Sequence, residues 1–206
     1  MPRAVPIHHP SADELSAAHA TYVEHEERNY AWHIARRALI DPVVGAHLSE
    51  REAVDLLLRS WNGRSSYTHQ LTLGAIENVV DATSQDRASF DGRALETFNE
   101  DDHPVVAEVY LRFRTVMGPT GAAKALGLLH PRFLPIWDSR IGNAYIGYRW
   151  SRDKATPEAY LTFVDYCREQ CTTDVDEAAF GPTLLKTLDE WNYCIWSKGW
   201  LPPPGP

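Results

Sequence analysis

The sequence predicts an all-α fold of roughly eight to ten helices in a single domain. Apolar residues recur at intervals of three and four along most of the chain. Helix start and stop signals separate these stretches, and the apolar–polar alternation typical of strands is nearly absent. The chain has 206 residues, enough to bury one full core. We therefore expect one helical domain over residues 1–200 and a flexible Pro-rich tail over residues 201–206.

Two capping boxes open the first two predicted helices. Residues 11–14 and 49–52 both have the pattern Ser-x-x-Glu, in which each side chain bonds to the other residue's backbone amide. The first helix is expected to run from this box to about Leu39, ahead of Asp41-Pro42. The second carries its apolar residues on one face and should break at Asn62-Gly63.

Further helices follow along the chain. Apolar spacing predicts one over residues 65–81, and a polar loop is expected over residues 83–92. Proline in the first turn predicts helices over residues 104–116 and 157–171. Gly181-Pro182 should open the last helix before the tail.

Composition predicts a soluble cytoplasmic protein with no membrane contact. No apolar run approaches the roughly 20 residues of a membrane span, and the first residues lack the apolar stretch of a secretory signal. Cys167 and Cys171, four residues apart, suggest a metal pair, but no histidine completes a ligand set. His25, His33 and His69 form no ligand set either. We expect free thiols, no metal and no cofactor.

Positive charge is concentrated in the middle of an acidic chain. The net charge is −8, which argues against a general nucleic-acid binder. Residues 103–154, however, contain eight Lys and Arg residues against three Asp and Glu residues. Such a basic centre would give a polyanion one docking face. An ordinary solvated surface is the alternative interpretation.

The most informative segment is Met117–Ile141, which has the sequence M-G-P-T-G-A-A-K-A-L-G-L-L-H-P-R-F-L-P-I-W-D-S-R-I. It predicts a Gly-containing hairpin, a short helix with Lys124 near its start, a Pro-bracketed loop, and a helix opened by Asp138. The amine of Lys124 and the carboxylate of Asp138 together suit chemistry at a sugar carbon. An amine attacks when burial or nearby positive charge lowers its pKa. A carboxylate stabilises the positive charge that develops as an N-glycosidic bond breaks.

This segment resembles the helix-hairpin-helix DNA glycosylase superfamily. The pattern K-x-L … P-x-x-x-P-x-x-D-S after a Gly-containing turn is similar to that of its compact 8-oxoguanine DNA glycosylase-like members. R-S-W-N-G-R at Arg59–Arg64 adds a looser similarity. The resemblance implies a DNA glycosylase, with or without AP-lyase activity, that removes a modified base, namely an oxidised or otherwise altered purine. The overall acidity of the chain leaves room for a single-stranded, nucleotide-sized or unusual modified DNA substrate. It implies Lys124 as the nucleophile and Asp138 as the acid/base and electrostatic partner.

The resemblance also implies how DNA is held. Backbone amides of the hairpin at Gly118, Thr120 and Gly121 would bind a phosphate. Independently of the resemblance, Arg132 and Arg140 flank the loop, where they would both bind phosphates and lower the pKa of Lys124. A base that leaves the stack needs an aromatic platform. The candidates for that platform are Trp61, Trp137 and Trp196.

Each candidate also has a structural interpretation. Asp138 occupies an N-cap position, where an aspartate can serve as a cap alone or as cap and catalyst together. Lys124 could face solvent, and the glycines could mark an ordinary helix–helix turn. Trp61 and Trp196 lie on amphipathic faces and are suited to core packing.

Two questions of function stay open at this point. Lys124 follows the second hairpin glycine by three residues, so the nucleophile position could instead fall on Ala123. The enzyme would then be a monofunctional hydrolase that uses Asp138 and water. The other functional classes are a catalytically silent nucleic-acid or nucleotide binding module on the same scaffold, and a helical interaction protein.

Overall fold

The computed structural model describes residues 8–40, 47–62, 71–147, 151, 153–171 and 183–205. These residues contain nine α-helices and no strand, which confirms the predicted all-α fold. The helices are α1 (Ala12–His25), α2 (Asn29–Ile40), α3 (Glu50–Asn62), α5 (Leu73–Ala82), α6 (Ser84–Arg87), α7 (His103–Leu129), α8 (Ser139–Ile146), α9 (Pro157–Gln170) and α10 (Leu184–Asn192). A π-helix, Tyr193–Lys198, continues directly from α10.

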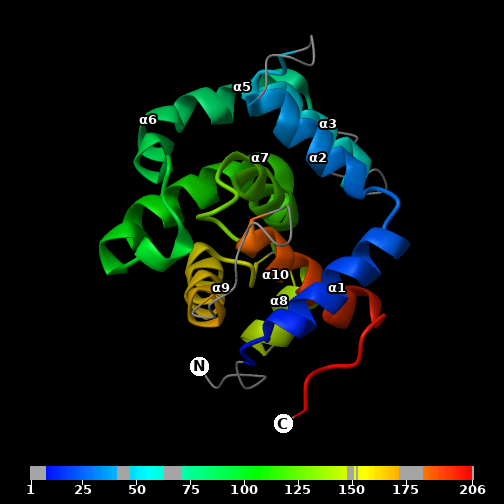
Figure 1. The fold of residues 1–206 in the computed structure, drawn as a ribbon. Coiled ribbons are helices and arrows are strands. Elements are labelled where there is room, and N and C mark those ends of the chain that lie inside the picture. The colour runs from blue at the N-terminus through cyan, green and yellow to red at the C-terminus, as the bar shows by residue number, and fades with distance from the viewer. Residues whose placement is uncertain are drawn as a thin grey trace.

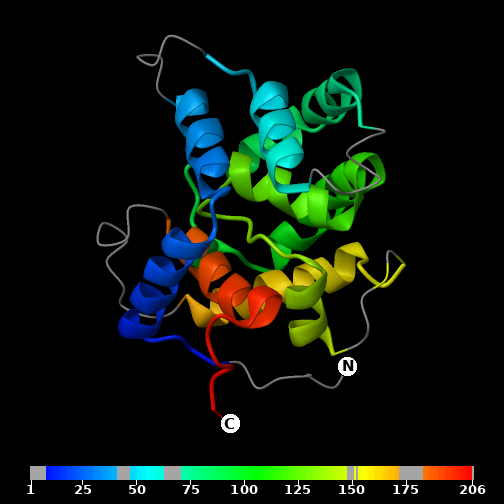
Figure 2. The same ribbon diagram turned by 90° about the vertical axis from the view of Figure 1, so that its right-hand side faces the viewer.

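Helix α7 lies between two groups of helices (Figure 1). One group comprises α2, α3, α5 and α6, and the other comprises α1, α8, α9 and α10. The perpendicular view shows the same division (Figure 2). Helices α2, α3 and α5 contact α7 on one side, α9 contacts it on the other, and α1 packs on α10. The core fills the space around α7, whose largest buried side chains include Tyr110 and Phe113.

The expectation of one long helix from residue 11 to about residue 39 is wrong. The Ser11 capping box is present, but α1 ends at His25 and α2 begins at Asn29. Glu26 leaves the helical conformation with φ −100° and ψ 88°, and its carbonyl accepts the Asn29 amide at 3.0 Å. Apolar spacing continues through both helices, so periodicity could not reveal this turn. The break places Glu26 and Arg28 in the wall of a pocket.

One half of the second predicted capping box, the bond from the Ser49 amide to the Glu52 side chain, is present. The Glu52 carboxylate accepts hydrogen bonds from the Ser49 amide at 2.9 Å and from its hydroxyl at 2.7 Å. Helix α3 ends at Asn62, and Gly63 and Arg64 lie outside the described residues. The segment expected to be helical over residues 65–81 is described only from residue 71, and α5 begins at Leu73, after a Thr72 cap.

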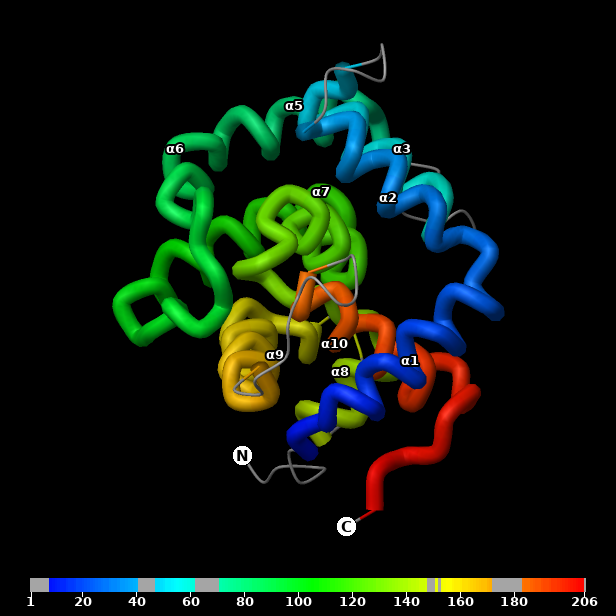
Figure 3. Tube along the Cα trace, in the orientation of Figure 1, coloured from blue at the N-terminus to red at the C-terminus, as the bar shows by residue number. Residues whose placement is uncertain are grey.

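The expectation of a polar loop over residues 83–92 is wrong. Helix α6 and a 3₁₀ turn at Ala88–Phe90 occupy this segment, which lies at one edge of the molecule (green, at the left of Figure 3). Arg87 is buried, and its guanidinium donates to the Thr83 hydroxyl, the Val80 carbonyl and the Glu50 carboxylate. A charged side chain such as Arg87 can be buried when its polar atoms are hydrogen-bonded. The segment therefore reads as polar in the sequence although part of it packs against the core.

The predicted hairpin is a turn made by one residue. Pro104 starts α7 as predicted, and Gly118 leaves the helical conformation with φ 74° and ψ 170°. The helix resumes at once, so Gly121 is helical rather than part of a hairpin. This turn divides α7 into two halves, and Lys124 lies in the second.

Gly118→Ala is expected to lower the free energy of unfolding by about 1–3 kcal/mol, because these dihedral angles are accessible almost only to glycine. Urea denaturation measures the change. Gly74→Ala is the control, because Gly74 is helical and an added Cβ meets nothing within 4 Å. That change should raise stability by about 0.5–1 kcal/mol. Equal unfolding midpoints for the two variants would contradict the role of Gly118.

The last two helices and the cysteines agree with the sequence where the structure describes them. Helix α9 starts at Pro157 as predicted, and α10 follows a Thr183 cap, with Gly181-Pro182 outside the described residues. The three cysteines are buried free thiols. Within the described ranges no helix has both the length and the apolar character to cross a membrane. Residues 201–205 adopt no helix, and the flexibility of the tail stays a prediction.

Candidate functional site

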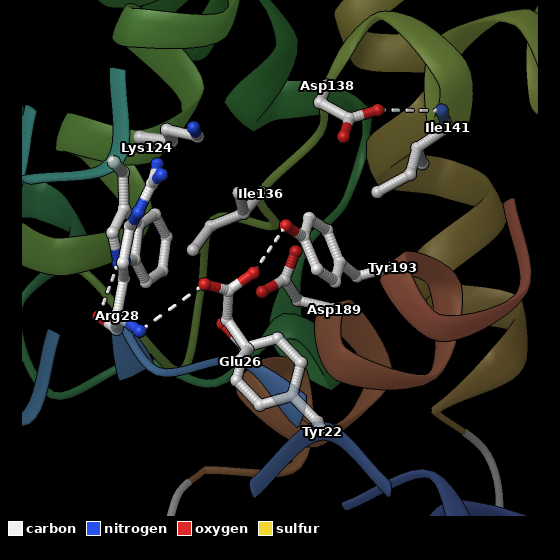
Figure 4. A pocket seen from close by; sticks show the side chains of 10 residues that line it. Tyr22, Glu26, Arg28, Lys124, Ile136, Asp138, Ile141, Asp189 and Tyr193 are labelled. Carbon is white, nitrogen blue, oxygen red and sulfur yellow. Dashed lines mark hydrogen bonds between the residues drawn. The ribbon is translucent and has the colours of Figure 1, made fainter. Parts of the chain in front are cut away.

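A pocket lies where the two groups of helices meet at α7 (Figure 4). Its volume of about 50 Å³ leaves room for several water molecules. The wall is built from the end of α1, the last turn of α3, the second half of α7, the start of α8, and α10 with its π-helix. Lys124 and Asp138 both line this pocket. The structure thus brings together the two residues to which the sequence assigned the chemistry.

Lys124 is half-buried, with its amine directed into the pocket. Its Nζ atom lies 5.3 Å from the centroid of the Trp61 ring. Burial lowers the pKa of Lys124 to about 8, although the carboxylates of Asp138, Asp189 and Glu26 act in the opposite direction. A substantial fraction of this amine is therefore unprotonated slightly above neutral pH, as nucleophilic attack requires.

Asp138 is the N-cap of α8. Its Oδ1 atom accepts hydrogen bonds from the Arg140 amide at 2.8 Å and the Ile141 amide at 2.9 Å. Its Oδ2 atom accepts one from the Ser197 hydroxyl at 2.6 Å. These three donors fix the orientation of the carboxylate. Asp138 therefore caps α8 and also lines the pocket. The sequence had left open whether this aspartate is a cap alone or a cap and a catalyst together.

Glu26 is a pocket residue that the sequence did not indicate. It lies in the break between α1 and α2, and its side chain is 14% exposed. Burial opposes ionisation, but hydrogen bonds from the Tyr193 hydroxyl and the Arg28 amide lower the pKa of Glu26. The Tyr193 bond measures 2.7 Å, and the Lys198 amine lies 3.6 Å from the same carboxylate oxygen.

A buried ionic cluster adjoins the pocket, and the sequence did not predict it. Lys186 on α10 contacts Asp189 at 3.0 Å and Glu190 at 3.1 Å, and all three side chains are almost fully buried. Asp189 also lines the pocket. Burial opposes the charge on Lys186, but its two carboxylate neighbours and Tyr22 raise its pKa. The His19 ring lies 2.6 Å from the other Glu190 oxygen and extends the cluster toward the surface.

Of the three predicted tryptophans, Trp61 lines the pocket. Its indole nitrogen donates to the Arg28 carbonyl at 3.0 Å, which joins α3 to the break after α1. Trp137 is completely buried and packs between Tyr160 and Phe163, so its assignment as a base-stacking platform is wrong. Trp196 is half-buried against the core and does not line the pocket.

The residues expected to bind phosphate lie outside the pocket wall. Gly118 and Gly121 are buried and Thr120 is half-buried, whereas Arg132 and Arg140 are exposed. Arg140 donates to the Ser197 carbonyl, so it lies beside the residue that holds Asp138. Arg149 and Arg152, which contributed to the basic centre, lie outside the described residues. Phosphate binding stays a prediction for all five candidates.

The loop before Asp138 is fixed by close packing. Ile136 lines the pocket, and a Cβ atom at Gly127 would overlap Ile136 Cγ1. Glycine at this position in α7 therefore lets the loop approach the helix. The Tyr160 hydroxyl donates to the Pro135 carbonyl at 2.9 Å and holds the other side of the loop. These contacts set the path from Lys124 to Asp138.

The pocket therefore combines the Lys124 amine and the Arg28 guanidinium with three carboxylates and three aromatic side chains. The carboxylates are Glu26, Asp138 and Asp189, and the aromatic residues are Tyr22, Trp61 and Tyr193. Such a lining can bind a planar group and stabilise positive charge that develops on it. Among the residues described, no group of three or more His, Cys, Asp and Glu side chains is arranged to hold a metal ion. No protein-family model matches the sequence, and no curated protein and no solved structure matches the chain.

Proposed function

We propose that this chain is a DNA N-glycosylase that excises an altered purine, with Lys124 as the nucleophile and Asp138 as its carboxylate partner. The observation that carries the proposal is the meeting of these two residues in one pocket. Burial gives the amine a pKa of about 8, and three hydrogen bonds hold the carboxylate in place. The resemblance of Met117–Ile141 to helix-hairpin-helix glycosylases supports the same assignment.

In the proposed reaction, the bond between the sugar C1′ and the base nitrogen breaks, and its electron pair leaves with the base. The lone pair of Lys124 Nζ forms the new bond to C1′. Asp138 stabilises the positive charge on the sugar ring and accepts the proton that the attacking amine loses. Opening of the sugar ring then gives an imine, from which elimination of the 3′ phosphate would produce AP-lyase activity.

A catalytically silent nucleic-acid or nucleotide binding module is the second candidate. The observation that favours it is the occupation of both Asp138 oxygens, by two backbone amides and by the Ser197 hydroxyl. An aspartate held in this way serves fully as a helix cap without any reaction. The two candidates differ in whether turnover depends on Lys124 and Asp138.

Borohydride trapping tests the proposal. The protein is incubated with single-stranded and duplex oligonucleotides that each carry one altered base, 8-oxoguanine among them, and borohydride is then added to reduce an imine. A covalent adduct is expected, and its yield should rise as the pH increases through about 8, because Lys124 attacks only as the free amine. Lys124→Gln should abolish the adduct.

Lys154→Gln is the matched control, because Lys154 is an exposed lysine outside the pocket. It should trap as the wild type does. Base release without trapping would indicate the monofunctional route through Asp138 and water. Binding of the oligonucleotides without release of any base would reject the glycosylase and favour the binding module.

A further inference from the structure

The side chain of Glu26 occupies a central position in the pocket. It extends from the break between α1 and α2 toward the space bordered by Tyr22, Ile136 and Tyr193 (Figure 4). It is remote in sequence from Lys124 and Asp138, which lie on the opposite part of the wall. A ligand whose reacting atom is near those two residues would therefore present its far edge to Glu26.

The contacts of Glu26 leave acceptor positions on both of its oxygens. A carboxylate has about four lone-pair sites, two on each oxygen. Oε2 accepts the Tyr193 hydroxyl at 2.7 Å, and Oε1 accepts the Arg28 amide at 3.3 Å. The Lys198 amine pairs with Oε2 at 3.6 Å, beyond hydrogen-bond distance. Two adjacent donors on a ligand can thus meet the two oxygens together.

The ionisation state of Glu26 restricts what it can bind. Burial opposes ionisation, but hydrogen bonds from Tyr193 and Arg28 together with the charges of Lys198 and Arg28 lower the pKa of Glu26, so the side chain is an acceptor at neutral pH. An ionised carboxylate has no proton to donate. It therefore binds edges that present donors and repels edges that present a lone pair.

We propose that Glu26 selects purines that present two adjacent N–H donors, as the N1–H and exocyclic amine of a guanine-type edge do. This inference rests on the proposed function, because it places the excised base in the pocket. Two parallel hydrogen bonds to a charged carboxylate are short and strong, and they also fix the orientation of the ring. Adenine presents a lone pair at N1 beside its amine, and hypoxanthine lacks the amine.

Equilibrium binding of nucleosides tests the proposal without any need for turnover. Guanosine, inosine and adenosine are titrated into the wild-type protein by calorimetry. Guanosine and inosine differ only in the exocyclic amine, so one charge-assisted hydrogen bond separates them. We expect guanosine to bind about tenfold or more tightly than inosine, and adenosine to bind most weakly.

Glu26→Gln should reduce the preference for guanosine over inosine to about twofold or less, because an amide offers one acceptor and one donor group. Glu24→Gln is the control, since Glu24 is an exposed carboxylate on α1 that does not line the pocket. The Glu24→Gln variant should keep the wild-type preference.

Several results would overturn the inference. They are equal binding of guanosine and inosine by the wild type, an unchanged preference in Glu26→Gln, and the absence of binding by all three nucleosides at millimolar concentration. Failure of the proposed function would look different. A preference for guanosine that depends on Glu26, combined with no base release from any oligonucleotide, would keep the ligand assignment and reject the glycosylase.

Discussion

Lys186→Met is expected to lower the free energy of unfolding by about 3–5 kcal/mol. The Lys186 amine lies 3.0 Å from Asp189 and 3.1 Å from Glu190, and less than a tenth of each of these side chains is exposed. Methionine fills a similar volume but leaves both carboxylates buried without their cation. Removal of one partner from a buried ionic cluster costs more than the cluster contributes, because the remaining charges have lost their hydration.

Urea denaturation at pH 7 measures this loss, and Lys124→Met is the matched control. Burial lowers the pKa of Lys124, so its charge is disfavoured in the folded protein and its replacement should change stability by no more than about 1 kcal/mol. The Lys186→Met defect should lessen on acidification. Its buried carboxylates would have raised folded-state pKa values, so their contribution favours folding at low pH and is lost as the pH rises. Similar losses for the two lysines would contradict the cluster's role.

Asp138→Asn is expected to reduce turnover by about 10²–10⁴-fold with little change in melting temperature. The variant removes the negative charge that stabilises the reacting sugar and accepts a proton. The asparagine carbonyl can still accept the Arg140 and Ile141 amides, because asparagine is as good an N-cap as aspartate. Single-turnover base release and thermal denaturation measure the two effects separately.

Asp138→Ala provides the comparison. It should lose activity to the same extent and also about 1 kcal/mol of stability, because alanine cannot cap α8. A fully active Asp138→Asn variant would reject the proposed mechanism and leave Asp138 as a cap alone. Loss of both activity and folding in Asp138→Asn would show that the charge itself maintains the fold.

Local signals in the sequence predicted much of the fold. The capping interactions at Ser11 and Ser49, the first-turn prolines and the N-cap at Asp138 depend on residues within four positions of each other. They could therefore be identified without knowledge of the tertiary structure. The placement of Lys124 and Asp138 in one pocket was also anticipated, because only a short loop joins their helices.

The other features depend on contacts between distant residues. The break at Glu26 is stabilised by Tyr193, and the burial of Arg87 by Glu50. Nothing near Trp137 in the sequence distinguishes a core tryptophan from a surface platform, since Tyr160 and Phe163 determine its burial. In the sequence, the segment around Lys186 shows only an ordinary amphipathic pattern. Its charged residues are buried because α1 packs on α10. Such features follow from tertiary packing rather than from local pattern.

The hydrogen bond between Glu26 and Tyr193 joins residues separated by most of the chain. A polypeptide that emerges from the ribosome in sequence order can form α2, α3 and α7, which contact one another, before α10 and the π-helix have been made. Until then Glu26 lacks Tyr193, and Asp138 lacks Ser197. The pocket is therefore completed only after Tyr193 and Ser197 have been made and have packed in place, so any activity of the pocket begins only then.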